Sequence, residues 1–311
     1  MENESKNRIA HILSVPFTGL GLYNGFRGNS WLRHRINVFK QFLIPSLQVQ
    51  TAQDFVLWVQ WRQEERNNPQ VIAFKEYIDG LGIKNVFTFS GVVLWDDKYL
   101  DDVAQIRLID AWHGSMGAVI NAIGDADTIY WTLQPSDDCY HLTALESIRK
   151  ILGETDLQAI GFTKGYVCDY KTIEVREWNP ETNPPFYTVK YDRETFIDPL
   201  KNFQYSAHKS HEFLPEKLKY GKIEGRGFLV GTHQGNISTV FNHPYTGARC
   251  EDVLKGFGLG NTAPLHIPFS VRKELFKRFP FKVQKKLRYW AGEKKWVLRP
   301  FFSWFYNWIR S

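Results

Sequence analysis

Residues 129–141 read IYWTLQPSDDCYH, in which a run of strand-forming residues leads through a proline to the adjacent acids Asp137 and Asp138. Adjacent carboxylates that follow a buried strand repel each other and lose hydration, so they need a compensating partner. In open α/β sheets, ligands bind beyond the carboxyl ends of the strands. The stretch therefore predicts that the two acids serve a binding site at the end of a central strand.

The sequence before this stretch alternates between strand and helix patterns. Strand patterns occupy 8–15, 54–61, 85–91 and 127–133; helix patterns occupy 31–47, with a stop near Pro45, 69–82 and 101–124. This order predicts an α/β fold with a parallel, doubly wound sheet over the first half of the chain. From residue 142 the pattern becomes mixed α+β. We therefore predict one half at 1–141, a second half of the same domain at 142–265, and a tail at 266–311.

The composition is that of a globular protein without disulfides. Hydrophobic residues make up 43% and charged residues 23%, while the aromatic share of 15% is high enough to supply stacking surfaces as well as core. Three widely spaced cysteines without zinc-site spacing indicate a reducing compartment. The start, MENESKNRIAHILSV, lacks the features of a signal peptide, and no apolar run is long enough to span a membrane. These features predict a bacterial-style cytoplasmic protein.

Positive charge is concentrated at the C-terminus. Residues 271–311 hold 12 Lys and Arg against two Glu, a local charge of +10 in a chain of net charge +6, so residues 1–270 sum to −4. Aromatic residues interleave with these cations, as in segments that lie in a membrane interface. Nucleic-acid binding would use similar residues, but the net acidic body without a nucleic-acid motif disfavours it. The tail could also pack back onto the domain as a C-terminal helix.

Five strings in order resemble one family: WLRHRINVFKQFLIPSLQVQTAQDFVLWV, TIYWTLQPSDD, PPFYTVKYDRETFIDPL, HKSHEFL and GTHQGNISTVFNHP. They resemble the bacterial rhamnosyltransferase family, which has a GT-A-like glycosyltransferase fold, over residues 8–250 but not over the tail. The resemblance implies a hexosyltransferase that moves a sugar, rhamnose by the family's name, from a nucleotide-diphosphate donor to a cell-surface or lipid-linked glycan, with inversion. It makes 1–141 the nucleotide-sugar-binding half and 142–265 the acceptor-side half. Peripheral attachment of the tail to the inner face of the membrane would suit cell-wall polysaccharide biosynthesis.

The resemblance also implies roles for the acids. In GT-A enzymes an Asp-x-Asp motif holds Mg²⁺ or Mn²⁺, which neutralises the leaving diphosphate through hard oxygen ligands. We expect Asp138 to bind this metal, Asp137 to bind the ribose or the metal, and Ser136 to contact the donor. The family's pattern is Asp-Ser-Asp-Asp, and Pro135 replaces the first acid, which weakens the expected metal site. Alternatively, Ser136 and Asp137 cap the following helix, although a cap explains only one acid.

Two further strings supply the remaining chemistry that the resemblance implies. Glu212 is the expected acceptor base, since a carboxylate within hydrogen-bond reach can take the proton of an attacking hydroxyl, and His211 lies beside it. The alternative is a solvated acid near a helix N-terminus. His233, at the end of an apolar strand, is expected at the metal or diphosphate, with Asn236 and His243 as further candidates. A lone histidine at a strand end is more often a hydrogen-bonded structural residue, which is the alternative for His233.

Three donor contacts are expected from position alone. Arg107 lies on the helix pattern before the acid strand and could reach the diphosphate, or pair with Asp102 or Asp110 at the surface. Phe17 and Thr18 follow the first strand and are candidates for contacting the nucleotide base. A different class of function also fits the sequence: a catalytically inactive paralogue that keeps the fold and binds glycans or membranes.

Overall fold

A computed structural model of the chain describes residues 8–18, 20–21, 28–93, 101–198, 200–201, 211–233 and 248–268. The chain divides into two compact units, residues 1–265 and 266–311. The elements below all belong to the first unit. Almost all of the predicted membrane-surface tail, from residue 269 onward, lies outside the described residues.

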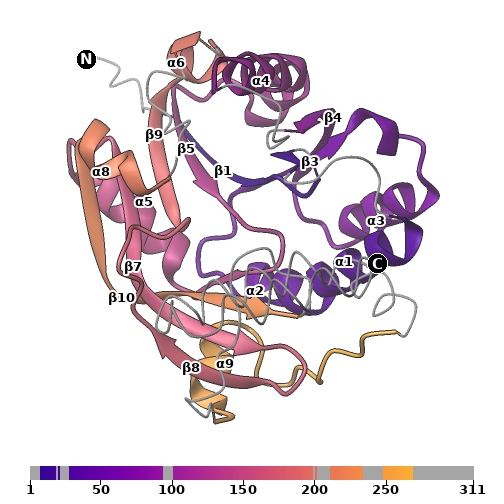
Figure 1. Cartoon of the computed structure of the whole chain (residues 1–311). Helices are drawn as coiled ribbons and strands as arrows, with labels where there is room; N and C mark the ends of the chain where they lie inside the picture. Colours follow the sequence, from indigo (N-terminus) through magenta and orange to yellow (C-terminus); the bar gives the residue numbers. More distant parts are fainter. Residues whose placement is uncertain are drawn as a thin grey trace, which may run out of the picture. The chain divides into compact units, whose positions relative to one another are not determined.

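One half of the central sheet is built from parallel strands (Figure 1). They are β1 (Ile9–Val15), β2 (Leu20–Gly21), β3 (Val56–Arg62), β4 (Asn85–Val93) and β5 (Thr128–Leu133). Their spatial order is β2-β4-β3-β1-β5, and β1 pairs in parallel with β3 and β5, so that Ile12 lies opposite both Val56 and Trp131. The predicted parallel half, with β5 leading to the two acids, is confirmed.

The second half continues the same sheet with strands of both directions. These are β6 (Cys139–Tyr140), β7 (Ala159–Asp169), β8 (Glu174–Trp178), β9 (Tyr187–Asp192) and β10 (Tyr220–Thr232). β9 runs antiparallel to both β5 and β7, β8 antiparallel to β7, and β10 parallel to β7. The short β6 runs antiparallel to β10, which brings the acid-bearing loop before β6 to the end of β10. The predicted mixed half is confirmed.

Helices cover both faces of the sheet, because neighbouring strand residues point to opposite sides. Leu13 and Leu57 pack in one core cluster with α1 (Asn29–Val38), η1 (Phe39–Leu43), α2 (Ile44–Gln48), α3 (Pro69–Gly80) and α5 (Ala144–Glu154). Ile12 and Trp58 pack in another with α4 (Asp101–Ile123), α6 (Arg193–Ile197) and α8 (Leu214–Lys217). The sheet is therefore doubly wound. Three short helices complete the described elements: η2 (Gln63–Glu65), η3 (His211–Phe213) and α9 (Glu251–Gly256).

A continuous helical segment from residue 29 to residue 48 carries side chains to the acid loop. It passes from α1 through the π-helical η1 into α2, so the predicted stop near Pro45 is wrong. Pro45 stands at the start of α2, where its missing N–H is tolerated because the preceding π-helical turn changes the hydrogen-bond pattern. The helical segment therefore continues without a break from residue 29 to residue 48.

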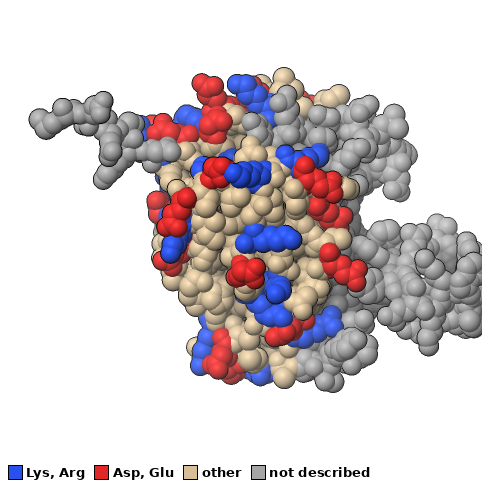
Figure 2. Space-filling view, turned by 90° about the vertical axis from the view of Figure 1, so that its left-hand side faces the viewer, with Lys and Arg blue, Asp and Glu red and all other residues tan. Residues whose placement is uncertain are grey.

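The described surface carries both signs of charge. Figure 2 shows Lys and Arg side chains interspersed with Asp and Glu over one face. Such mixing differs from the single-sign patch that nucleic-acid-binding domains present. Of the helices within the described ranges, none combines the length and the apolar character needed to cross a bilayer.

Candidate active site

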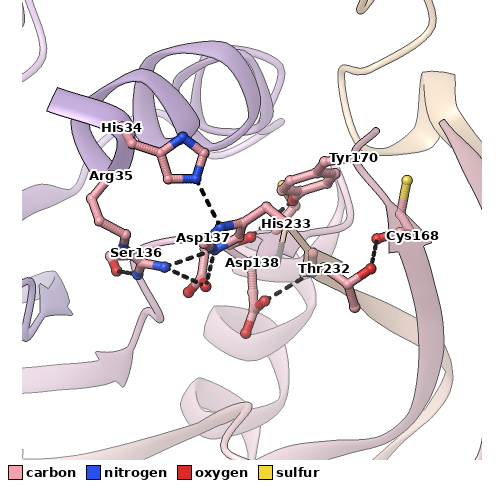
Figure 3. Close-up of polar contacts among 11 residues, drawn as sticks. His34, Arg35, Ser136, Asp137, Asp138, Cys168, Tyr170, Thr232 and His233 are labelled. Carbon is pink, nitrogen blue, oxygen red and sulfur yellow. Dashed lines mark hydrogen bonds and ion pairs between the residues drawn. The ribbon is translucent and has the colours of Figure 1, made fainter. Parts of the chain in front are cut away.

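The loop after β5 brings Asp137 against α1 (Figure 3). Arg35 Nη1 donates to Asp137 Oδ2 at 2.8 Å, and the two side chains are only 11% and 15% exposed. Arg35 Nη2 donates to Ser136 Oγ at 2.5 Å. The guanidinium therefore compensates the Asp137 carboxylate and ties the loop to the helix.

His233, directly after β10, completes this cluster. Its Nε2 lies 2.9 Å from Asp137 Oδ2 and 2.7 Å from Arg35 Nη1. Its Nδ1 lies 3.3 Å from Nε2 of His34, the neighbour of Arg35 on α1. Two residues that the sequence assigned to the donor site, Asp137 and His233, are thus in contact.

Three polar atoms of the cluster form a nearly equilateral triangle: Arg35 Nη1, Asp137 Oδ2 and His233 Nε2. If His233 Nε2 carries a proton, it donates to Asp137, but two N–H donors, Nε2 of His233 and Nη1 of Arg35, then lie against each other. If Nε2 is unprotonated, it accepts from Arg35, but its lone pair then faces the carboxylate. No single proton arrangement makes all three short contacts favourable hydrogen bonds.

The two adjacent acids have different environments. Asp138 is buried, and its Oδ1 accepts the backbone N–H of Gly231 at 3.0 Å. Burial, with the nearby Asp137 charge, raises the pKa of Asp138 well above its usual value. Burial also acts to raise the pKa of Asp137, but the Arg35 charge and the hydrogen bond to His233 outweigh it and hold that pKa below its usual value. Asp137 is therefore the ionised partner.

Packing behind the loop fixes its position. The ring of Tyr170 stacks on Phe42 with centroids 3.5 Å apart, and its hydroxyl donates to the backbone carbonyl of Asp137 at 2.9 Å. β10 passes so close that a Cβ on Gly231 would lie 2.2 Å from the Tyr170 ring and 2.4 Å from that carbonyl. Only glycine fits there without displacing the loop.

Two side-chain atoms of the cluster have the spacing of neighbouring ligands of a divalent cation. Adjacent ligands of an octahedral Mg²⁺ lie about 3 Å apart, and Asp137 Oδ2 and His233 Nε2 are 2.9 Å apart. The described residues contain no group of three or more His, Cys, Asp or Glu side chains placed for a metal. A two-residue site is still compatible with ions that complete their shell with water and substrate phosphates. The pair at this spacing is Asp137 and His233. The sequence predicted Asp138 and His233, with Asp137 at the ribose or the metal; Asp138 Oδ1 accepts from Gly231 in the structure, and its role at a metal stays a prediction.

The two candidates for the nucleotide base lie in the core. Phe17 is 7% exposed and stacks on Trp61 with centroids 4.4 Å apart. Thr18 is buried and its hydroxyl donates to Glu65, which is also buried. Both side chains are therefore buried in this structure, which disfavours a contact with the nucleotide base, and that role stays a prediction.

Helix capping by the acid loop is also excluded. The helix α5 begins at Ala144 and its N-cap is Thr143. Ser136 and Asp137 are separated from it by β6, so they do not cap it. The adjacent acids therefore need another explanation than helix capping.

The predicted acceptor base is not beside the cluster. Glu212 and His211 lie in η3, ahead of the first residue of β10, whereas His233 follows its last residue, and the strand is 13 residues long. Glu212 is exposed, and His211 Nδ1 lies 2.6 Å from the Asn183 carbonyl, to which it donates. The role of Glu212 as acceptor base stays a prediction.

Of the three further candidates, the structure describes only Arg107. Arg107 lies on α4, which packs on the face of the sheet opposite to α1. Asn236 and His243 lie outside the described residues. Their predicted roles are untested.

Sequence reasoning missed Arg35 and His34. A signal was present, because Trp31, Arg35 and Phe39 are spaced four residues apart and therefore share one side of the helix. Trp31 and Phe39 are buried, so Arg35 is a charge set into an apolar stripe. A charge in that position indicates a buried anionic partner.

Comparisons with known proteins do not decide the family. No protein-family model matches the sequence, and no curated protein matches it. Among solved structures the chain is similar to S. aureus TarS, with 10% identity, 72% of this chain and 37% of that chain covered, and a TM-score of 0.37. It is also similar to TarS 1–349, with 11% identity, 90% and 74% coverage and a TM-score of 0.36. A third is a protein described as a nucleotide-diphospho-sugar transferase from Desulfovibrio desulfuricans G20, with 12% identity, 69% and 78% coverage and a TM-score of 0.32.

The chain thus spans 37% of the length of the first of these structures. TM-scores below 0.5 at these identities do not establish a shared activity. The function proposed below therefore rests on the residues of this chain, and the similarity to rhamnosyltransferases stays a resemblance.

Proposed function

We propose that this protein is a glycosyltransferase that uses a nucleotide-diphosphate sugar. The observation that carries the proposal is the cluster of Arg35, Asp137 and His233 beyond the carboxyl end of β5, the edge at which parallel α/β sheets bind ligands. A carboxylate and an imidazole spaced for a divalent cation, with a guanidinium beside them, match the two needs of a diphosphate leaving group: a metal and a phosphate-binding cation.

Each side chain of the cluster has a separate task in this proposal. Asp137 and His233 would hold Mg²⁺ or Mn²⁺, which when bound would offset the charge of the leaving diphosphate. Ser136 keeps the loop on Arg35, and Asp138 fastens the loop to β10 through Gly231. Together these contacts hold the donor-facing groups in place before a ligand binds, which reduces the ordering cost of binding.

The acceptor side of the reaction rests on the resemblance alone. We infer from it a cell-surface or lipid-linked glycan acceptor, a rhamnosyl donor, inversion at the anomeric carbon, and Glu212 as base. Contact of residues 266–311 with the inner face of a bacterial membrane belongs to the same proposal.

Nucleotide binding tests the donor half of the proposal. Isothermal titration calorimetry should show that UDP or dTDP binds in the presence of Mn²⁺, that binding is weaker without Mn²⁺, and that Asp137→Ala combined with Asp138→Ala removes the gain from Mn²⁺. The exposed Asp110 on α4 provides a matched control, and Asp110→Ala should bind as the wild type does. Absence of binding for both nucleotides, or unchanged binding in the double variant, would refute the site.

An inactive glycan- or membrane-binding paralogue is the second candidate. Two observations favour it: Pro135 stands where the family has an acid, and Glu212 is separated from His233 by the length of β10. A screen of nucleotide sugars by ³¹P NMR separates the candidates. Donor hydrolysis above background that Glu212→Ala abolishes would exclude the paralogue, whereas nucleotide binding without turnover of any donor would support it.

A further inference from the structure

Arg35 contacts the same two atoms that a divalent cation would bind. Its Nη1 is 2.8 Å from Asp137 Oδ2 and 2.7 Å from His233 Nε2. A second cation cannot contact both atoms while the guanidinium remains, because two positive charges would then share them at close range in a largely buried place. In the free protein, Arg35 and a divalent cation are therefore competitors for the same pair of atoms.

A displaced guanidinium would remain close to the site. The backbone of Arg35 is held by α1, whose neighbouring residues Leu32 and Ile36 are buried in the core. Its Nη2 also contacts Ser136 Oγ, a contact that does not depend on Asp137. The side chain is 11% exposed, so a guanidinium separated from its carboxylate needs another anion nearby. The planar guanidinium matches phosphate oxygens in a bidentate geometry.

We propose that Arg35 is a donor-binding residue with two positions. Its guanidinium rests on Asp137 and His233 in the free protein, and it passes to the diphosphate of the donor when these two side chains bind a divalent cation. The inference rests on the proposed function and adds to it a residue and an order of events. The triangle of short contacts then belongs to the resting position and ends when the guanidinium moves.

Cooperative binding follows from this exchange. The cation must displace the guanidinium, which costs free energy unless a diphosphate receives it. The diphosphate in turn cannot bind the guanidinium of Arg35 while this group is bound to Asp137 and His233, unless a cation has displaced it. Each ligand should therefore strengthen binding of the other by the same factor.

The test is a Mn²⁺ titration followed by electron paramagnetic resonance, in which bound Mn²⁺ loses the signal of the free ion. Without nucleotide, Arg35→Ala should bind Mn²⁺ about tenfold more tightly than the wild type, because a competing charge is gone. Arg33, exposed on the same helix, gives the matched control, and Arg33→Ala should bind Mn²⁺ as the wild type does. Equal or weaker Mn²⁺ binding by Arg35→Ala would overturn the competition.

Nucleotides then test the second position of Arg35. UDP or dTDP should raise the Mn²⁺ affinity of the wild type at least tenfold, UMP should raise it much less, and Arg35→Ala should lose most of the gain from the diphosphates. An undiminished gain in Arg35→Ala would overturn the donor role of Arg35 while leaving the proposed function in place. If neither diphosphate binds the wild type with or without Mn²⁺, the donor role fails together with the proposed function, although the Mn²⁺ arm still decides the competition.

Folding is monitored by the thermal unfolding midpoint of each variant. Should Arg35→Ala fail to fold, Arg35→Gln removes the charge while keeping much of the side chain, and the same Mn²⁺ comparison applies to it. The difference between UDP and UMP in the wild type needs no variant at all; equal effects of the two nucleotides would overturn the proposal.

Discussion

Replacing Arg35 with Met should destabilise the protein chiefly because the Asp137 carboxylate stays buried without its guanidinium partner. Removing one member of a buried ion pair costs about 3–5 kcal/mol, because the other charge stays buried without compensation. Asp137 retains 15% exposure and its contact with His233, which reduces this cost, so we expect about 2–3 kcal/mol at pH 7. The packing contribution of the aliphatic stem is preserved by Met.

The double-mutant cycle separates the charge effect from packing. Asp137→Asn in the Arg35→Met background removes the uncompensated charge. The double variant should therefore lose about 2 kcal/mol less stability than the sum of the losses in the two single variants. Because the pKa of Asp137 is held below its usual value, the carboxylate is ionised at pH 7, and the coupling is lost only as the pH falls through that lowered pKa. Measurement near neutral pH therefore captures the full coupling.

Urea unfolding followed by tryptophan fluorescence measures each free energy, provided that the slope with denaturant stays constant across the four proteins. Arg33→Met on the exposed side of α1 is the matched control and should change stability by less than about 0.5 kcal/mol. If the stability losses of Arg35→Met and Asp137→Asn add to that of the double variant within about 0.5 kcal/mol, the two side chains are not coupled and the electrostatic explanation of the site is wrong.

Three further predictions concern other parts of the protein. Burial, with a smaller effect of Arg149, lowers the pKa of His11 to about 3, so on acidification the unfolded chain binds a proton before the native protein does. The free energy of unfolding should therefore decrease as the pH falls from 6.5, by about 2 kcal/mol at pH 5. In urea titrations, His11→Gln should lose less stability over this pH range. Gly231→Ala should cost about 1–3 kcal/mol and weaken Mn²⁺ binding, whereas Gly117→Ala, where a Cβ meets nothing within 4 Å, should be neutral or stabilising in thermal unfolding. Deleting residues 271–311 should abolish sedimentation with anionic liposomes.

Each of these predictions has a result that would contradict it. An unchanged pH slope in His11→Gln would mean that other groups set the acid sensitivity. Normal stability and Mn²⁺ binding in Gly231→Ala would show that the loop tolerates a side chain against Tyr170. Retained liposome binding after the deletion would rule out the tail as the membrane contact, and loss of RNA or DNA binding instead would favour the nucleic-acid alternative.

Strand patterns in the sequence were sufficient to predict the parallel half of the sheet. Continuous apolar runs such as DFVLWVQW describe strands that are covered on both faces, and the helix patterns between them leave few other arrangements. The position of the two acids at the end of β5 follows from the same pattern. Their separate environments do not, since Asp138 is oriented by Gly231, which is 93 residues away in the chain.

Side-chain partners that are distant in the sequence explain what the sequence alone did not reveal. Phe17 follows the first strand, where ligands commonly bind, but stacking on Trp61 and packing against Phe74 place it in the core. Arg35 was missed because its partners, Ser136 and Asp137, lie about a hundred residues later. Periodicity marked Arg35 as a charge in an apolar stripe, but only the tertiary arrangement shows the carboxylate that it compensates.

A crystal structure with UDP or dTDP and Mn²⁺ bound would show the donor site and the second position of Arg35 together. We predict that Mn²⁺ binds Asp137 and His233, and that the diphosphate contacts the ion with a phosphate oxygen within hydrogen-bond distance of Arg35. A nucleotide bound away from the end of β5, or a diphosphate at this site that leaves Arg35 on Asp137 and His233, would contradict it.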